Sequence, residues 1–141
     1  MENNQIYGIL CIDDEPVILQ SMKTQLKQHF GKKFRYEFAE SGEEAFEILD
    51  EFNQNQISTV IIVSDWLMPK MKGDELLIKV HKKYPSIVTI LLTGQADSEA
   101  VARAQKHAQL HKFLPKPWEE NELVEAIDSG FKKFLSQNST V

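Results

Sequence analysis

The chain has 141 residues, the usual size of one domain with a single core, which leaves no room for a second, output domain. Its 42% hydrophobic and 26% charged residues argue against disorder, and its single cysteine excludes an intrachain disulfide and a cysteine metal cluster. The net charge of -5 argues against direct nucleic-acid binding, and the polar N-terminus and short apolar runs argue against export or a membrane span, so we expect a cytoplasmic protein.

The first predicted strand, Tyr7–Ile12, is apolar and leads directly into the acidic stretch Asp13-Asp14-Glu15. Pro16 suits the first turn of a helix, where its missing N–H would have had no partner. The segment that follows predicts an amphipathic helix that ends at Gly31-Lys32-Lys33. Its expected buried face consists of Ile18, Met22, Leu26 and Phe30.

The second predicted strand, Phe34–Ala39, alternates apolar and polar residues, which is typical of a half-exposed edge strand. Ser41 and Glu44 form a capping-box pattern that begins a second helix. Its expected buried face consists of Ala45, Leu49 and Phe52. We predict a polar connection over Asn53–Ser58.

The run of β-branched residues Val60–Val63 predicts a strand buried on both faces, which ends on the carboxylate of Asp65. Taken alone, Asp65 is explained equally well as the first residue of a turn. A loop through Gly73 leads to a third helix, which Tyr84-Pro85 ends because a residue before proline disfavours the helical conformation. Its inward residues are Leu76, Leu77 and Val80.

The fourth predicted strand, Ile87–Leu92, ends at Thr93-Gly94-Gln95, and Asp97 is predicted to cap the helix after it. The inward face of this helix holds small residues, so we expect it to shift more easily than the others. Its members are Ala100, Val101, Ala104 and Ala108.

The last predicted strand, Lys112–Leu114, leads into Pro115-Lys116-Pro117, and the final helix spans Glu119–Leu135. Its inward residues are Leu123, Ile127, Phe131 and either Phe134 or Leu135. Five strands that alternate with five helices predict an α/β fold with a doubly wound, five-stranded parallel sheet of order 2-1-3-4-5. We expect one domain over residues 1–135 and a flexible tail over residues 136–141.

The predicted strand ends bring several reactive groups to one edge of the sheet. The carboxylates of Asp13, Asp14 and Asp65 would repel one another there, and oxygen ligands of this kind suit Mg²⁺. Thr93 adds a hydroxyl and Lys116 an ammonium, although Thr93 is also an ordinary residue for a strand end. Together these groups indicate a phosphoryl-transfer site at which an aspartate becomes an acyl phosphate.

These residues resemble the receiver domains of two-component response regulators, a family with a flavodoxin-like fold. The resemblance covers Tyr7 to Leu135 and depends on four motifs, each at the end of a predicted strand. They are Asp13-Asp14-Glu15, Asp65 to Gly73 with Met68-Pro69 and Met71-Lys72-Gly73, Thr93-Gly94, and Lys116-Pro117. Any one motif would be weak evidence, but the set in this order is specific.

The resemblance implies that Asp65 accepts a phosphoryl group from a phosphohistidine on a sensor histidine kinase or a phosphotransfer protein. It implies that Mg²⁺ is the cofactor, bound directly by Asp14, largely through water by Asp13, by Asp65, and by the backbone carbonyl of Leu67.

The resemblance also implies roles for the last two strands. Lys116 would contact the phosphoryl oxygens, and the Lys116–Pro117 bond would be cis. Thr93 would donate its hydroxyl to the phosphoryl group, and Phe113 would change rotamer with it. Phe113 lacks the hydroxyl of the tyrosine often found there, so its switch would work by packing, and plain core packing is the alternative.

On this interpretation the protein is a switch in a phosphorelay, with slow autodephosphorylation, and not a turnover enzyme. Its output would be a downstream protein target or a domain that this chain lacks, and a homodimer through the face of the fourth helix, fifth strand and fifth helix is a further option. The stretch from Thr93 to Asp97 together with Pro117-Trp118 resembles receivers fused to kinase, cyclase or phosphodiesterase modules, which favours the interpretation that the chain is a fragment of a multidomain regulator.

Two other classes of protein share some of these sequence features. Hydrolases of the haloacid dehalogenase group also form an aspartyl phosphate, but they need a second carboxylate two residues later, where this chain has Leu67. An adaptor that works without phosphorylation would not need the intact set of acids, hydroxyl and lysine. The bulky Trp66 either shields the acyl phosphate from water or restricts small phosphodonors, or it simply covers the edge of the sheet.

Overall fold

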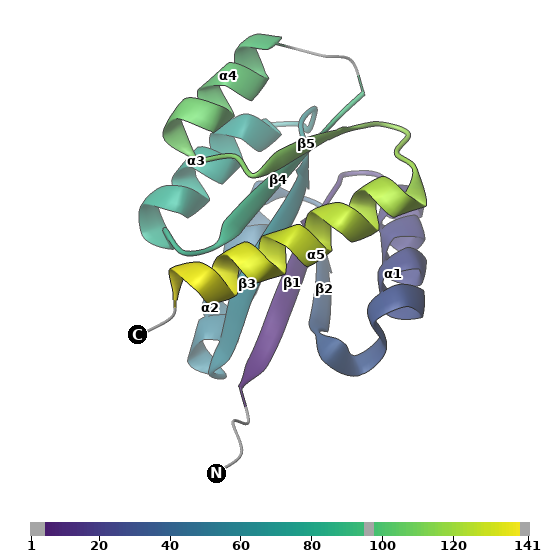
Figure 1. Cartoon of the computed structure of the whole chain (residues 1–141). Coiled ribbons are helices and arrows are strands. Elements are labelled where there is room, and N and C mark those ends of the chain that lie inside the picture. Colours follow the sequence, from purple (N-terminus) through teal and green to yellow (C-terminus); the bar gives the residue numbers. More distant parts are fainter. Residues whose placement is uncertain (1–4, 95–97, 139–141) are drawn as a thin grey trace.

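A computed structural model of the chain describes residues 5–94 and 98–138. Its centre is a five-stranded parallel sheet in the order β2-β1-β3-β4-β5 (Figure 1), which confirms the predicted fold class and strand order. The strands are β1 (Ile6–Ile12), β2 (Arg35–Ala39), β3 (Ile57–Asp65), β4 (Val88–Thr93) and β5 (Lys112–Pro115). The helices are α1 (Pro16–Phe30), a 3₁₀ turn η1 (Gly31–Lys33), α2 (Gly42–Gln54), α3 (Gly73–Lys83), α4 (Ser98–His107) and α5 (Glu120–Gln137).

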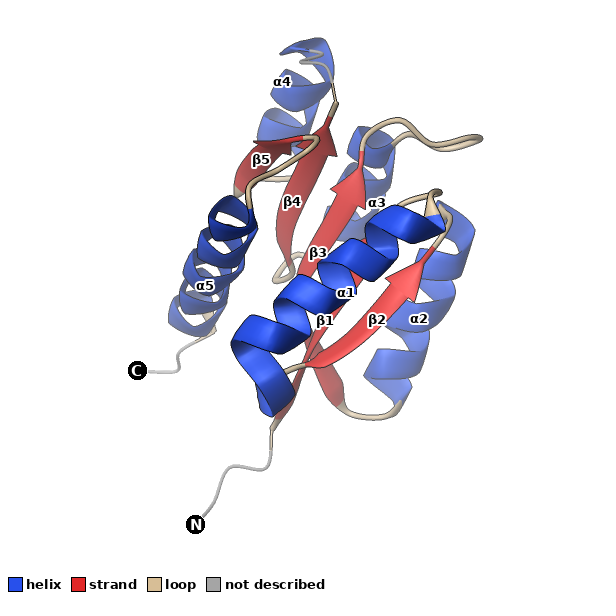
Figure 2. Cartoon of the chain, turned by 90° about the vertical axis from the view of Figure 1, so that its right-hand side faces the viewer, coloured by secondary structure: helices blue, strands red, loops and turns tan. Residues whose placement is uncertain are grey.

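The helices cover both faces of the sheet and create two separate cores. Helices α1 and α5 pack on one face, and α2, α3 and α4 pack on the other (Figure 2). The central strands have to serve both cores, which explains their unbroken apolar runs: Ile61 and Val63 of β3 belong to the first core, and Ile62 belongs to the second.

Parallel pairing brings the carboxyl ends of the central strands to one edge. Ile12 is paired with Ser64, Asp65 with Leu92, and Thr93 with Pro115. Strand order reverses between β1 and β3, the position where ligands bind in open sheets of this type. The residues that follow β1, β3, β4 and β5 therefore face a common hollow.

The helices differ from the sequence predictions in several details. In α1, Leu19 is buried together with Met22 and Leu26, whereas Ile18 and Phe30 are only partly buried against the core. A 100° step per residue gives a broad apolar stripe, so Leu19 belongs to the same face. In α5, Phe134 is buried and Leu135 is 43% exposed, which decides between the two alternatives.

The capping box predicted for α2 forms only in part. The Ser41 hydroxyl accepts a hydrogen bond from Glu44 N at 3.1 Å, as predicted. The Glu44 carboxylate, however, accepts from Glu40 N at 2.7 Å and not from the backbone of Ser41. The polar connection predicted over Asn53–Ser58 is wrong, because α2 continues to Gln54 and β3 already begins at Ile57.

The last helix continues through Gln137, two residues beyond its predicted end, because Phe134 anchors its final turn in the core. The predicted cap at Asp97 lies outside the described residues. Among the described helices, none combines the length and the apolar character that a membrane-spanning helix requires.

Candidate functional site

Asp13 is a buried carboxylate at the end of β1. Its side chain is fully buried, and its two oxygens have different partners. Oδ1 accepts a hydrogen bond from Glu15 N at 2.8 Å, which shapes the turn into α1, and Oδ2 accepts one from Lys116 Nζ at 2.8 Å. Burial of a charge is tolerated here because both oxygens have partners.

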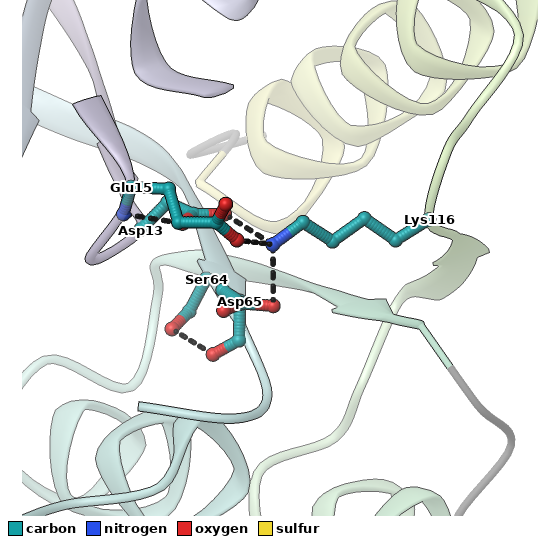
Figure 3. Close-up of polar contacts among 5 residues, drawn as sticks. All are labelled: Asp13, Glu15, Ser64, Asp65 and Lys116. Atoms are coloured by element: carbon teal, nitrogen blue, oxygen red, sulfur yellow. Dashed lines mark hydrogen bonds and ion pairs between the residues drawn. The ribbon is translucent and has the colours of Figure 1, made fainter. Parts of the chain in front are cut away.

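Asp65 ends β3, the central strand, and only 4% of its surface is exposed. Its Oδ1 lies 3.2 Å from Lys116 Nζ (Figure 3). Burial, together with the negative charge of Asp13, raises the pKa of Asp65 to about 6, and Lys116 offsets this only in part. At neutral pH the group is therefore an ionised carboxylate in a poorly hydrated position, which is a suitable nucleophile.

Lys116 reaches into the acid cluster from the loop after β5, as Figure 3 shows. Its ammonium contacts Asp13, Asp65 and, at 3.5 Å, Glu15 Oε1. Burial alone would lower the pKa of Lys116, but the hydrogen bonds and ion pairs with Asp13 and Asp65 outweigh it, so the pKa is raised. Lys116 N also donates to Thr93 O at 3.0 Å, and the Lys116–Pro117 peptide bond is cis.

The three aspartates form a cluster of oxygen donors. Each of Asp13, Asp14 and Asp65 offers a carboxylate oxygen within 4.8 Å of the others, and Asp14 is the most exposed of the three. Oxygen donors at this spacing fit a small hard cation such as Mg²⁺, which keeps several of its waters. The residues present therefore fit a divalent cation on the solvent side of the cluster.

A glycine sets the path of the chain behind Asp65. Gly73 N donates to Trp66 O at 2.7 Å, and Trp66 N donates to Leu92 O at 2.9 Å. A Cβ atom on Gly73 would lie 2.0 Å from Asp65 O, so only glycine permits this approach. The first turn of α3 thus lies directly against the backbone of Asp65.

The remaining predicted residues surround Asp65 at different depths. Thr93 is buried at the end of β4, and Leu67 is 62% exposed. Phe113 of β5 is 48% exposed and is not plain core. An open cavity of about 590 Å³ gives access to Asp65 and Lys116. Its lining consists of Glu15, Ile18, Asp65, Trp66, Leu67, Gly94, Lys116 and Pro117.

Sequence reasoning assigned no role to two acids that the structure places near the site. Glu15 lines the cavity and contacts Lys116, and its position next to the acid pair was the available signal. Asp74 is 3% exposed and accepts a hydrogen bond from the Trp66 indole at 3.1 Å. No local pattern distinguishes Asp74 from an ordinary acid in the first turn of a helix, where acids are favoured anyway.

Comparison with known proteins agrees with this geometry. The sequence model of the family "Response regulator receiver domain" matches residues 9–128. Chemotaxis protein CheY1 of Helicobacter pylori is 30% identical over 122 residues, which cover 85% of this chain and 93% of that protein. The hydrogenase transcriptional regulatory protein HoxA of Cupriavidus necator is 28% identical over 84% of this chain.

Solved structures show the same architecture. The signal receiver domain of an HD domain-containing protein from Pseudomonas fluorescens Pf-5 has a TM-score of 0.86 and 27% identity, and the match covers 100% of this chain and 98% of that one. A CheY-like receiver domain protein from Methanospirillum hungatei JF-1 has a TM-score of 0.82 and 25% identity, covering 95% and 100%. This chain spans only 23% of HoxA, 34% of YesN of Bacillus subtilis and 12% of the sensor kinase CckA of Brucella abortus.

Proposed function

This chain belongs to the response regulator receiver domains of two-component systems, and from that premise we propose that it is switched by transfer of a phosphoryl group to Asp65. The observation that carries the proposal is the pairing of the buried Asp65 carboxyl group with Lys116 beside two further carboxylates. The donor would be a phosphohistidine on a sensor kinase or a phosphotransfer protein.

The proposed transfer uses groups that are already in place. A carboxylate oxygen of Asp65 attacks phosphorus, the P–N bond of the donor breaks, and the imidazole leaves with its electron pair and takes up a proton. The product is an acyl phosphate on Asp65. Lys116, already 3.2 Å from Asp65 Oδ1, would move its contact to the new phosphoryl oxygens and stabilise their charge.

Mg²⁺ is the proposed cofactor. When bound, it would neutralise charge that develops on the phosphoryl oxygens. Asp14, Asp65 and the Leu67 carbonyl would bind it directly, and Asp13 largely through water, since Asp13 Oδ2 already accepts from Lys116. Lys116 would then share the cluster with the cation, which lowers the mutual repulsion of the three carboxylates.

The switch is proposed to run through Thr93 and Phe113. The Thr93 hydroxyl would turn toward a phosphoryl group on Asp65, and the half-exposed Phe113 ring would follow by packing, since it has no hydroxyl of its own. The surface altered in this way would be formed by α4, β5 and α5. This surface would bind a downstream protein, a further domain or a second copy of the chain.

Labelling tests the acceptor assignment. With Mg²⁺ and radiolabelled acetyl phosphate, wild type should incorporate label and Asp65→Asn should not. Asp128→Asn, which changes a partly exposed acid of α5 paired with Lys132, is the matched control and should label like wild type. Equal labelling of wild type and Asp65→Asn would refute Asp65 as the acceptor.

Hydrogen exchange tests the switch. Beryllofluoride with Mg²⁺, which mimics an aspartyl phosphate, should change the amide exchange of α4, β5 and α5 more than that of α2. Exchange that is unchanged on this surface, while beryllofluoride demonstrably binds, would contradict the switch and leave the acceptor assignment intact.

A further inference from the structure

Trp66, the residue directly after Asp65, is held on two sides by charged groups. Its indole Nε1 donates a hydrogen bond to Asp74 Oδ1 at 3.1 Å, and the ammonium of Lys72 lies 5.2 Å from the ring centroid. The ring packs against the core under α3 and also borders the cavity that leads to Asp65. Trp66 is therefore more than a cover for the sheet edge, because its orientation depends on a specific acceptor.

The acceptor of this hydrogen bond, Asp74, also holds a residue of another helix. Asp74 lies in the first turn of α3 with a side chain only 5% exposed, and its second oxygen, Oδ2, accepts a hydrogen bond from Arg103 Nε at 2.9 Å. Arg103 belongs to α4, which lies beside α3 (Figure 1). One buried carboxylate thus joins the neighbour of Asp65 to α4.

We propose that Asp74 is a positioning residue that couples Asp65 to α4, with one oxygen on the Trp66 indole and the other on Arg103. The inference rests on the proposed role of Asp65 as phosphoryl acceptor. It adds a connection that runs through β3 and α3, separate from Thr93 and β4.

The coupling has a physical cause in the weak attachment of α4. The buried side chains of this helix are small, namely Ala100, Val101 and Ala104, so packing holds it less firmly than the leucine-rich helices. A shift of α4 that moves Arg103 away breaks the hydrogen bond from Arg103 to the buried Asp74 carboxylate, and the loss of this partner costs free energy. The contact therefore favours the α4 position found with an unmodified Asp65, and its removal should ease activation.

The indole resonance of Trp66 provides a direct readout. In a Trp118→Phe background, the one remaining indole N–H signal in a ¹H–¹⁵N spectrum belongs to Trp66. Arg103→Gln should shift this signal, because Arg103 and the Trp66 indole donate to the two oxygens of the same carboxylate, Asp74. Lys106→Gln removes the same charge from an exposed position of α4 and should leave the signal in place. A signal insensitive to Arg103→Gln would overturn the proposal.

Binding of beryllofluoride with Mg²⁺ then measures the coupling to Asp65. Arg103→Gln should raise its apparent affinity roughly 3- to 10-fold, within the usual range for coupled sites. Arg103→Lys, which keeps the charge, should restore most of the wild-type affinity. A Trp66→Phe background keeps a ring but removes the indole N–H. In this background, Arg103→Gln should change the logarithm of the beryllofluoride affinity by less than about half as much as it does with Trp66 present.

The outcomes separate this inference from the proposed function. Two results would show that Asp74 does not couple the two sites: equal beryllofluoride affinity of wild type and Arg103→Gln, or an equal effect of Arg103→Gln on that affinity in the Trp66 and the Trp66→Phe backgrounds. Either result leaves Asp65 as the proposed acceptor. If wild type binds no beryllofluoride and takes no label from acetyl phosphate, the proposed function itself fails. Arg103 carries the test because its exposed position makes misfolding of the variant a minor concern, unlike substitution of the buried Asp74.

Discussion

At the level of single residues, the site depends on how burial and charge act on one carboxylate. Asp65 is almost fully buried and faces Asp13, so its charged form is disfavoured, while Lys116 supplies the compensating charge. A pKa of about 6 keeps the group ionised at neutral pH but leaves it more basic than an ordinary aspartate. The same burial that raises the pKa of Asp65 should therefore reduce the stability of the fold.

The first prediction concerns the pH dependence of stability. Because the pKa of Asp65 is raised in the folded state, the folded protein holds a proton between about pH 4 and pH 6 that the unfolded chain releases, and stability falls as pH rises through this range. Without Mg²⁺ at pH 7.5, Asp65→Asn should be more stable than wild type by up to about 3 kcal/mol. Urea denaturation should show that the difference in free energy of unfolding between Asp65→Asn and wild type shrinks toward pH 4. A difference that does not depend on pH would contradict the raised pKa of Asp65 as its cause.

The second prediction isolates the contribution of Lys116. Lys116→Ala removes the cation that lowers the pKa of Asp65, so this pKa should rise further above 6. Titration of the ¹³C carboxyl resonance of Asp65 measures the change directly. Lys112→Ala, which removes an exposed lysine from β5, the strand that precedes Lys116, should leave the Asp65 titration as it is in wild type.

At the level of elements, the fold positions Asp65 by bringing backbones together. The β3 strand carries Asp65 to the sheet edge, and the start of α3 then closes against it through the hydrogen bond from Gly73 N to Trp66 O. A helix begins here without a side-chain cap, so the close backbone approach, rather than capping, sets where α3 starts. The absence of a Cβ at Gly73 is what allows it.

The third prediction tests this close approach. Gly73→Ala would place a methyl group 2.0 Å from Asp65 O, so either α3 or the acceptor has to move. The free energy of unfolding should fall by at least about 2 kcal/mol, and labelling by acetyl phosphate should fall with it. Gly94→Ala is the matched control, because its Cβ would meet nothing closer than Lys116 Cβ at 4.0 Å and should change stability by no more than about 0.5 kcal/mol.

The elements also differ in how firmly they are held. Helices α1, α2, α3 and α5 bury large apolar side chains, whereas α4 buries two alanines and a valine. A helix attached by so little apolar area can change position at modest cost, and polar contacts such as Arg103–Asp74 then decide which position it takes.

For the whole molecule, the two cores keep the sheet rigid while the site lies at its edge. The central strands are buried on both faces, so the carboxylates of Asp13 and Asp65 are fixed in space with little freedom to relax their repulsion. A divalent cation bound by the three carboxylates would relieve that repulsion, and it would do so only in the folded state, where they meet. Cation binding should therefore be linked to global stability.

The fourth prediction follows from this linkage. At ten times its dissociation constant, Mg²⁺ should raise the free energy of unfolding of wild type by about 1.4 kcal/mol, and chelation should reverse the effect. Asp14→Asn should bind Mg²⁺ more weakly, so its free energy of unfolding should rise less at the same Mg²⁺ concentration. The gain in wild type should shrink below pH 6 as Asp65 takes up a proton. Equal stabilisation of wild type and Asp14→Asn would place the cation elsewhere.

The sequence by itself determined the architecture and which strand ends meet at one edge of the sheet. Unbroken apolar runs that each end on a polar or charged residue predict buried parallel strands, and parallel strands necessarily bring those ends to one edge. For that reason residues as far apart as Asp13 and Lys116 could be assigned to one place from their order alone, and the structure brings them within 2.8 Å.

Only the tertiary structure decided how the side chains pair. Lys116 contacts Asp13 more closely than Asp65, and Trp66 turns its indole N–H toward Asp74, which also holds Arg103 of another helix. Periodicity and motifs report which face of an element a residue occupies. They do not report which partner it meets across elements, because that choice depends on the packing of two helices and a strand against one another in three dimensions.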